Sequence, residues 1–141
     1  MKVVAIVQAR MGSTRLPNKV MKEIDGMPMI ELLLARLSRA KEVDQIVVAT
    51  PVDEKNEPLA AHVEKLGYSC VHGSENDVLQ RYLDSARHAK ADIVVRITSD
   101  CPMTDPELVD EAITEFKQQD LDYLSNTSPP TYPDGLDTEV F

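Results

Sequence analysis

The sequence has only two cysteines, Cys70 and Cys101, which form neither a CxxC pair nor a disulfide framework. No apolar run approaches the roughly 20 residues that a membrane-spanning helix needs. The N-terminus lacks the apolar stretch and the cleavage site of a signal peptide. We therefore expect a cytoplasmic protein that keeps its thiols reduced and makes no contact with a membrane.

Positive charge is also scarce, with 15 Lys and Arg against 24 Asp and Glu and a formal net charge of −9. Because such a protein repels phosphate polymers, binding to nucleic-acid polymers is not expected. The charge is uneven, however. Residues 1–22 carry five cations and no acid, which leaves −14 on the remainder. This local basic segment is suited to a small anionic ligand.

Short apolar runs alternate with amphipathic segments along the chain, which indicates buried strands separated by helices. This order predicts a single α/β domain over residues 1–141, with a mostly parallel sheet and helices on both faces. Strands are expected at residues 3–7, 45–50, 69–72, 93–98, 122–127 and 136–141, with helices beginning near residues 28, 57, 78 and 106 and a turn at 128–135. The ligand site of such a sheet lies at the carboxyl ends of its strands.

The helix that begins near Val78 has apolar residues at positions 78, 79, 82, 83 and 86, which predicts its buried face. Arg81 lies off that face, so it is either a solvated arginine or a residue that contacts a substrate. Ser74 and Asp77 have the spacing of a capping box at the start of this helix.

The segment after the first strand, residues 8–19, contains one glycine and matches neither GxGxxG nor GxxxxGK[ST]. It carries three cations, Arg10, Arg15 and Lys19, with no acid between them. Arginine binds phosphate through a two-pronged donor set, and lysine acts as a compact charge. The position at a strand end favours phosphate binding over a solvated basic loop.

Asp100 follows the strand at residues 93–98, so its carboxylate is expected in the same crevice as these cations. A carboxylate beside a phosphate group needs a divalent cation between them, and Mg²⁺ is the simplest candidate. The alternative is an aspartate that only forms a turn before Pro102. Asp105 precedes Pro106 and is predicted to cap the next helix.

The sequence leaves open the roles of three further charged residues. Arg96 lies within an apolar strand and needs a partner, which is Asp100, a substrate anion or solvent. Asp137 and Glu139 are two residues apart on an expected strand and therefore share one face. They either hold sugar hydroxyls or a second metal ion, or form an exposed polar face.

Several segments together resemble the cytidylyltransferases that make CMP-activated sugars. The nearest branch is the SpsF-like group of spore-coat polysaccharide biosynthesis, which is related to the CMP-Kdo and CMP-sialic acid synthetases. The segments are ARMGSTRLPNK (9–19), GMPMI (26–30), VAT (48–50), GS (73–74), DVLQRY (77–82), RITSDCP (96–102), DP (105–106) and PDGLD (133–137) with Glu139.

The resemblance implies the nucleotide-diphosphosugar transferase type of Rossmann-like fold and the transfer of CMP from CTP to a sugar hydroxyl with release of pyrophosphate. It implies site residues of four kinds. These are Arg10, Lys19 and Asp100 for catalysis; Arg10, Gly12, Ser13, Arg15, Lys19, Ser74 and Arg81 for the nucleotide; Asp137 and Glu139 for the sugar; and Asp100 for Mg²⁺. Gly12 would let the backbone approach the nucleotide closely.

The implied partners are CTP and a sugar, with a 2-keto sugar acid as one candidate, and the implied assembly is a homodimer. Members of the family continue into a segment that supplies another metal-binding aspartate, so we expect this chain to lack that segment. Two alternatives stay open. One is a nucleotide-binding domain without activity, and the other is a glycosyltransferase or another nucleotidyltransferase on the same fold.

Overall fold

The computed structural model describes residues 1–12, 15–127 and 135–141, which form one sheet of six strands, a short hairpin and four α-helices. The strand order in the sheet is β5-β4-β1-β6-β8-β7. Its first four strands are parallel, and β8 runs antiparallel to both β6 and β7. The bounds are β1 Val3–Gln8, β4 Gln45–Pro51, β5 Ser69–Gly73, β6 Ile93–Thr98, β7 Leu124–Ser125 and β8 Glu139–Val140.

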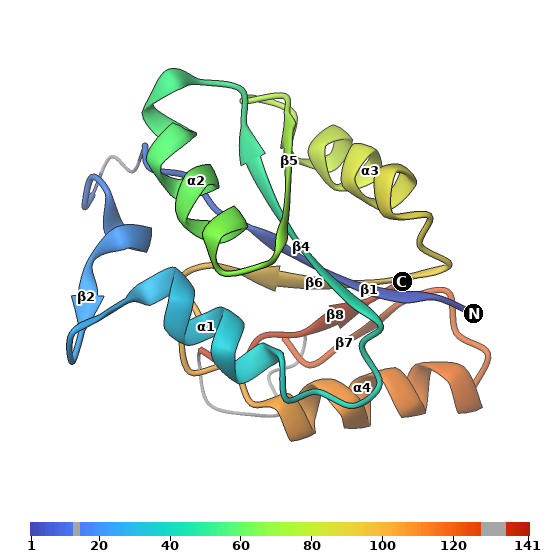
Figure 1. The fold of residues 1–141 in the computed structure, drawn as a ribbon. Coiled ribbons are helices and arrows are strands. Elements are labelled where there is room, and N and C mark those ends of the chain that lie inside the picture. Colours follow the sequence, from blue (N-terminus) through green and yellow to red (C-terminus); the bar gives the residue numbers. More distant parts are fainter. Residues whose placement is uncertain (13–14, 128–134) are drawn as a thin grey trace.

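Helices cover both faces of this sheet (Figure 1). Alternate residues of the central strand β1 therefore pack in separate core clusters on the two faces. Val3, Ala5 and Val7 pack on the face that α1 (Met29–Leu37), α2 (Glu57–Lys65) and α4 (Pro106–Gln118) cover. Val4 and Ile6 pack against α3 (Val78–Ala89) on the other face. The sequence-based prediction of a mostly parallel α/β sheet between helices is thus confirmed.

A small hairpin that the sequence analysis did not predict separates β1 from α1. It pairs β2 (Glu23–Ile24) with β3 (Met27–Pro28) and follows the 3-10 helix η1 (Lys19–Met21). Asp25 and Gly26 form its turn, with φ of 52° and 81°. Positive φ at both central residues is typical of the tight hairpin turn that Asp-Gly favours.

The buried face of α3 agrees with the predicted one at Val78, Tyr82 and Ala86, which pack in the core, but not at the other two apolar positions. Leu79 and Leu83 are exposed, at 75% and 40%, whereas Arg81 is 1% exposed and lies with Tyr82 on the inner face. Ser85 and Ala89, one and two turns along from Arg81, are buried on the same side of the helix.

The last two strands are shorter than predicted, with two residues each in β7 and β8. Most of the expected turn at 128–135 lies outside the described residues. Asp137 precedes β8 instead of lying within it, so only Glu139 of the two acids pairs in the sheet. Among the helices of the described part, none has the length and hydropathy required to cross a membrane.

Candidate nucleotide site

A pocket of about 230 Å³ lies where β1 and β6 end. These neighbouring parallel strands are paired in register up to Gln8 and Thr98, and the N–H of Ser99 continues the pairing by donating to the carbonyl of Gln8. The two segments that follow the strands therefore face one another. The residues that line the pocket are Gln8, Ala9, Arg10, Lys19, Val20, Thr98, Ser99 and Asp100.

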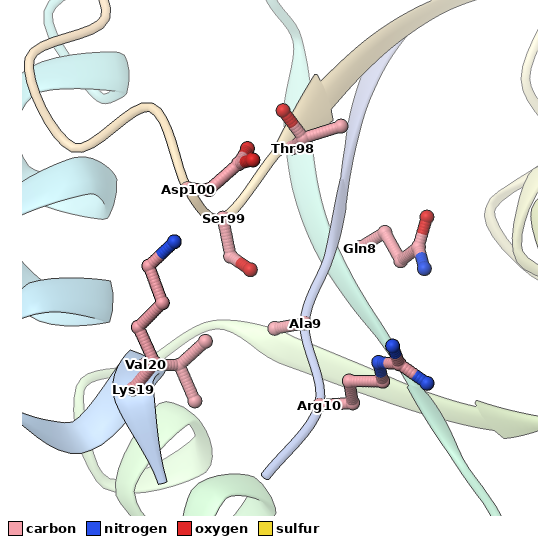
Figure 2. Close-up of a pocket in the computed structure, with 8 residues that line it drawn as sticks. All are labelled: Gln8, Ala9, Arg10, Lys19, Val20, Thr98, Ser99 and Asp100. Carbon is pink, nitrogen blue, oxygen red and sulfur yellow. The ribbon is translucent and has the colours of Figure 1, made fainter. Parts of the chain in front are cut away.

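Arg10, Lys19 and Asp100 all line this pocket, but their side chains do not all point the same way. Figure 2 shows Lys19 extending from η1 toward Ser99 and Asp100, whereas Arg10 extends to the other side of the chain that follows β1. Lys19 is half-buried, and Arg10 and Asp100 are exposed. An anion bound beside Lys19 would need a metal ion to screen it from Asp100.

A backbone hydrogen bond closes the loop that positions Lys19, since the N–H of Asn18 donates to the carbonyl of Met11 over 2.9 Å. Asn18 has a left-handed conformation with φ of 60° and precedes the first residue of η1. Of the two other predicted residues in this loop, Ser13 lies outside the described residues. Arg15 is exposed and is not among the residues that line the pocket.

The 3-10 helix η2 (Glu54–Asn56), which follows β4, supports the same loop. The buried amide of Asn56 accepts a hydrogen bond from the Met11 N–H (2.8 Å) and donates one to the Pro51 carbonyl (3.3 Å). Sequence reasoning missed Asn56, because its role depends on a contact between loops 45 residues apart that no local pattern marks.

Lys55 fills the space beside Gly12. A Cβ atom on Gly12 would lie 3.0 Å from the Lys55 Nζ, a tight contact that the flexible lysine would have to shift slightly to accommodate. Lys55 also forms ion pairs with Asp53 (3.3 Å) and Glu75 (3.5 Å). The group that lies close to Gly12 in this structure is therefore the Lys55 side chain. The predicted contact between Gly12 and a nucleotide stays a prediction.

Arg81 is buried beneath the loop after β5. Its Nη1 donates to the carbonyls of Ser74 (2.6 Å) and Glu75 (3.4 Å), and its Nε has no hydrogen-bond partner within the described structure. Burial lowers the pKa of Arg81, and the positive charge of Arg10 contributes in the same direction. The negative charge of Glu75 acts in the opposite direction.

Ser74 and Asp77 organise the start of α3 with one hydrogen bond of the predicted capping box, although the N-cap is Asp77. Asp77 is itself the N-cap, and its carboxylate accepts from the Gln80 N–H. The Ser74 hydroxyl accepts from the Asp77 N–H over 3.1 Å. Ser74 is exposed, so its side chain remains accessible to a ligand.

Asp100 lies next to the buried thiol of Cys101, with 3.7 Å between the Cys101 Sγ and the carboxylate Oδ1. Burial raises the pKa of Cys101, and the negative charges of Asp100 and Asp137 contribute to the rise. The carboxylates of Asp100 and Asp137 therefore both influence the pKa of the Cys101 thiol. Over residues 1–12, 15–127 and 135–141, no three His, Cys, Asp or Glu side chains form a metal-binding cluster.

The structure also places the remaining charged candidates. The Asp105 carboxylate accepts from the Glu107 N–H (2.8 Å) as the N-cap of α4, which confirms the predicted cap. Arg96 pairs with Glu139, with 3.1 Å between Nη1 and Oε2, and this partner was not among the three considered from the sequence. Glu139 and Asp137 line a second cavity, next to the first.

A model of the cytidylyltransferase family matches residues 4–134. The chain belongs to the cytidylyltransferase family. It is 37% identical over 132 residues to the spore coat polysaccharide biosynthesis protein SpsF of Bacillus subtilis, covering 91% of this chain and 55% of that protein. The chain therefore spans about half the length of this relative.

Solved structures of cytidylyltransferases share the fold. A cytidylyltransferase from Leptospira borgpetersenii superposes with a TM-score of 0.94 and is 36% identical, covering 100% of this chain and 60% of that one. A CMP:2-keto-3-deoxy-manno-octonic acid synthetase complexed with CTP superposes with a TM-score of 0.77 and is 26% identical, covering 85% and 49%. The predicted resemblance to this family is confirmed.

Proposed function

We propose that this chain binds CTP and that the protein transfers CMP to a sugar hydroxyl with release of pyrophosphate. The observation that carries the proposal is that Lys19 points toward Asp100 in a pocket at the carboxyl ends of β1 and β6, which Arg10 also lines. Ligands of open α/β sheets bind at this edge, and triphosphates need cations and a metal-binding carboxylate there. The family and the relative solved with CTP support cytidine as the base.

The reaction changes two bonds at the α-phosphorus of CTP. The sugar oxygen forms a bond to this phosphorus while the bond to the bridging oxygen breaks, and pyrophosphate leaves with that electron pair. The hydroxyl proton passes to water. Since negative charge builds up on the phosphate oxygens, Lys19 and Arg10 contribute by holding the triphosphate in line and neutralising this charge. Lys19 and Arg10 themselves are not changed chemically by the reaction.

Asp100 would hold the divalent cation, for which we propose Mg²⁺. The donor set fits this ion, because Mg²⁺ is commonly bound through one or two carboxylates together with substrate phosphates and water. One exposed carboxylate beside two cations matches that arrangement, whereas a cage of three protein ligands is not found within the described part of the chain. The bound ion would withdraw charge from the phosphate oxygens.

Other residues complete the proposed site. Gly12, Ser13, Arg15, Ser74 and Arg81 stay proposed nucleotide contacts. We place the reaction in cell-surface or spore-coat polysaccharide synthesis, as the name of the Bacillus subtilis relative suggests. We also propose that the protein is cytoplasmic, which its two free cysteines support, and that it forms a homodimer.

A nucleotide panel tests the proposal. With Mg²⁺ present, CTP is expected to raise the thermal unfolding temperature more than GTP or UTP does. Pyrophosphate release is then followed with CTP and a panel of sugars that includes 2-keto sugar acids. Release that requires both CTP and one sugar supports the reaction. Equal shifts with all three nucleotides, or none with CTP, would contradict the proposed nucleotide.

A further inference from the structure

Two successive turns carry Asp100 from the end of β6 toward α4. The Cys101 N–H donates to the Thr98 carbonyl over 3.2 Å, and Asp100 lies within this first turn. The second turn is closed twice at one acceptor, because the Thr104 N–H (3.1 Å) and the Thr104 hydroxyl (2.7 Å) both donate to the Cys101 carbonyl. Thr104 is 1% exposed. The position of Asp100 therefore depends on how firmly Thr104 is held.

Arg36, near the end of α1, holds Thr104 from outside this loop. Its Nε donates to the Thr104 carbonyl over 3.0 Å, a contact between residues 68 positions apart in the sequence. Arg36 follows Met29 by seven residues and Leu33 by three, so it shares one edge of the helix with these two buried side chains. Arg36 is itself half-buried, and it is not among the residues that line the nucleotide pocket. It therefore acts on the Asp100 turn from outside that pocket.

The same helix is joined to the segment that carries Lys19. The Met29 N–H, at the start of α1, donates to the Lys22 carbonyl over 2.8 Å, and the Lys22 N–H donates to the Lys19 carbonyl over 3.1 Å. Helix α1 thus connects the Lys19 segment at its start with the Asp100 turn near its end. Lys19 points toward Asp100 (Figure 2). The Arg36 contact therefore helps to set the spacing between a cation of the pocket and the proposed metal ligand.

The bond from Arg36 to Thr104 is of a strong kind. A charged donor forms a stronger hydrogen bond than a neutral one, and the carbonyl of a buried residue pays a desolvation cost when it loses its donor. Mg²⁺ requires near-ideal octahedral geometry with ligands at about 2.0–2.1 Å, so a small displacement of a carboxylate weakens its binding. Changes to groups that orient metal ligands typically cost about 10–100-fold in metal affinity. A displaced Asp100 turn would therefore weaken the metal-dependent part of CTP binding.

We propose that Arg36 is a positioning residue, which holds the Asp100 turn through the Thr104 carbonyl and thereby raises the affinity for CTP in the presence of Mg²⁺. The inference rests on the proposed function, since Asp100 is a metal ligand only if the protein binds CTP with a divalent cation. It goes beyond that function by giving a role at the site to a residue of α1 that does not line the pocket.

Three variants test the role of Arg36, with CTP affinity measured by calorimetry with and without Mg²⁺. Arg36→Met keeps an apolar stem but removes every donor, and it is expected to lose about tenfold or more of the gain in affinity that Mg²⁺ gives. Arg36→Gln keeps an N–H group as many bonds from the backbone as the arginine Nε, so it should retain most of the gain. Arg39→Met removes the same charge from an exposed position just after α1 and should retain it too. A full gain in Arg36→Met, or an equal loss in either of the other variants, would overturn the proposal.

Amide hydrogen exchange in the protein without CTP separates positioning from overall stability. In Arg36→Met the Cys101 N–H is expected to exchange about tenfold or more faster than in wild type, because the Asp100 turn opens more often, while the Val7 N–H in the central strand keeps its rate. Equal acceleration at both amides would mean that Arg36 only stabilises the fold and would overturn the proposal. If wild type gains no CTP affinity from Mg²⁺, the proposed function itself fails. If wild type gains affinity and Arg36→Met gains as much, only this inference fails.

Discussion

The side-chain oxygen of Asn56 accepts a hydrogen bond from the backbone N–H of Met11, 2.8 Å away and 45 residues earlier in the chain. Because Asn56 is fully buried, this bond joins the loop after β1 to the loop after β4 in a place that water does not reach. The same amide donates to Pro51. The loop that carries the cations of the nucleotide pocket is therefore held by a residue outside that pocket.

Asn56→Ala should lower the free energy of unfolding by about 1–3 kcal/mol, because it leaves the buried Met11 N–H without an acceptor. We also expect weaker CTP binding, since Met11 belongs to the cationic loop. Urea unfolding and calorimetry measure the two effects. The variant Asn56→Asp keeps an acceptor for Met11 and should bind CTP better than Asn56→Ala does. Equal CTP affinity in wild type and Asn56→Ala would show that the contact does not position the loop.

Lys19→Ala is expected to weaken CTP binding by about tenfold or more, since a hydrogen bond to a charged group is worth about 1.5–3 kcal/mol. Lys22 provides the matched control. It is exposed, lies just after η1 and does not line the pocket, so Lys22→Ala removes the same charge from the same segment. Calorimetric titration with CTP and Mg²⁺ compares the two. Similar losses in both variants would mean that only the overall charge matters.

The Cys70 thiol should react slowly with alkylating agents at neutral pH. Burial raises the pKa of Cys70 to about 11 from an ordinary value of 9.0, so the reactive thiolate is scarce until the pH rises through that range. Burial also raises the pKa of Cys101. Alkylation with iodoacetamide, followed by mass spectrometry, should accelerate as the pH approaches about 11. A rate at neutral pH equal to that of an unfolded cysteine peptide would contradict this expectation.

The sequence predicted the parallel strands and the helices between them because their apolar patterns reflect burial directly. Val3 to Val7 is apolar at every position, as expected for the centre of a sheet that is covered on both faces. The Asp25-Gly26 turn also carried a local signal, although the hairpin around it was not predicted. These features depend on neighbours in the chain, so a pattern can reveal them.

Contacts between distant segments could not be predicted in this way. The apolar pattern of α3 favoured Leu79 and Leu83, but the helix buries Arg81, whose guanidinium binds the Ser74 carbonyl in the preceding loop. Likewise, Arg96 pairs with Glu139 because β8 lies antiparallel to β6, an arrangement that depends on the whole sheet. Asp100 and Lys19 were predicted together because parallel strands end at one edge.

The central claim is that Asp100 binds CTP through a divalent cation, and calorimetric titration of CTP with and without Mg²⁺ tests it most directly. Wild-type protein and Asp122→Asn, which removes an exposed acid outside the pocket, should both bind CTP more tightly with Mg²⁺ than without. Asp100→Asn should fold normally and lose that gain. If Asp100→Asn keeps the full effect of Mg²⁺ on CTP affinity, the account of this site is contradicted.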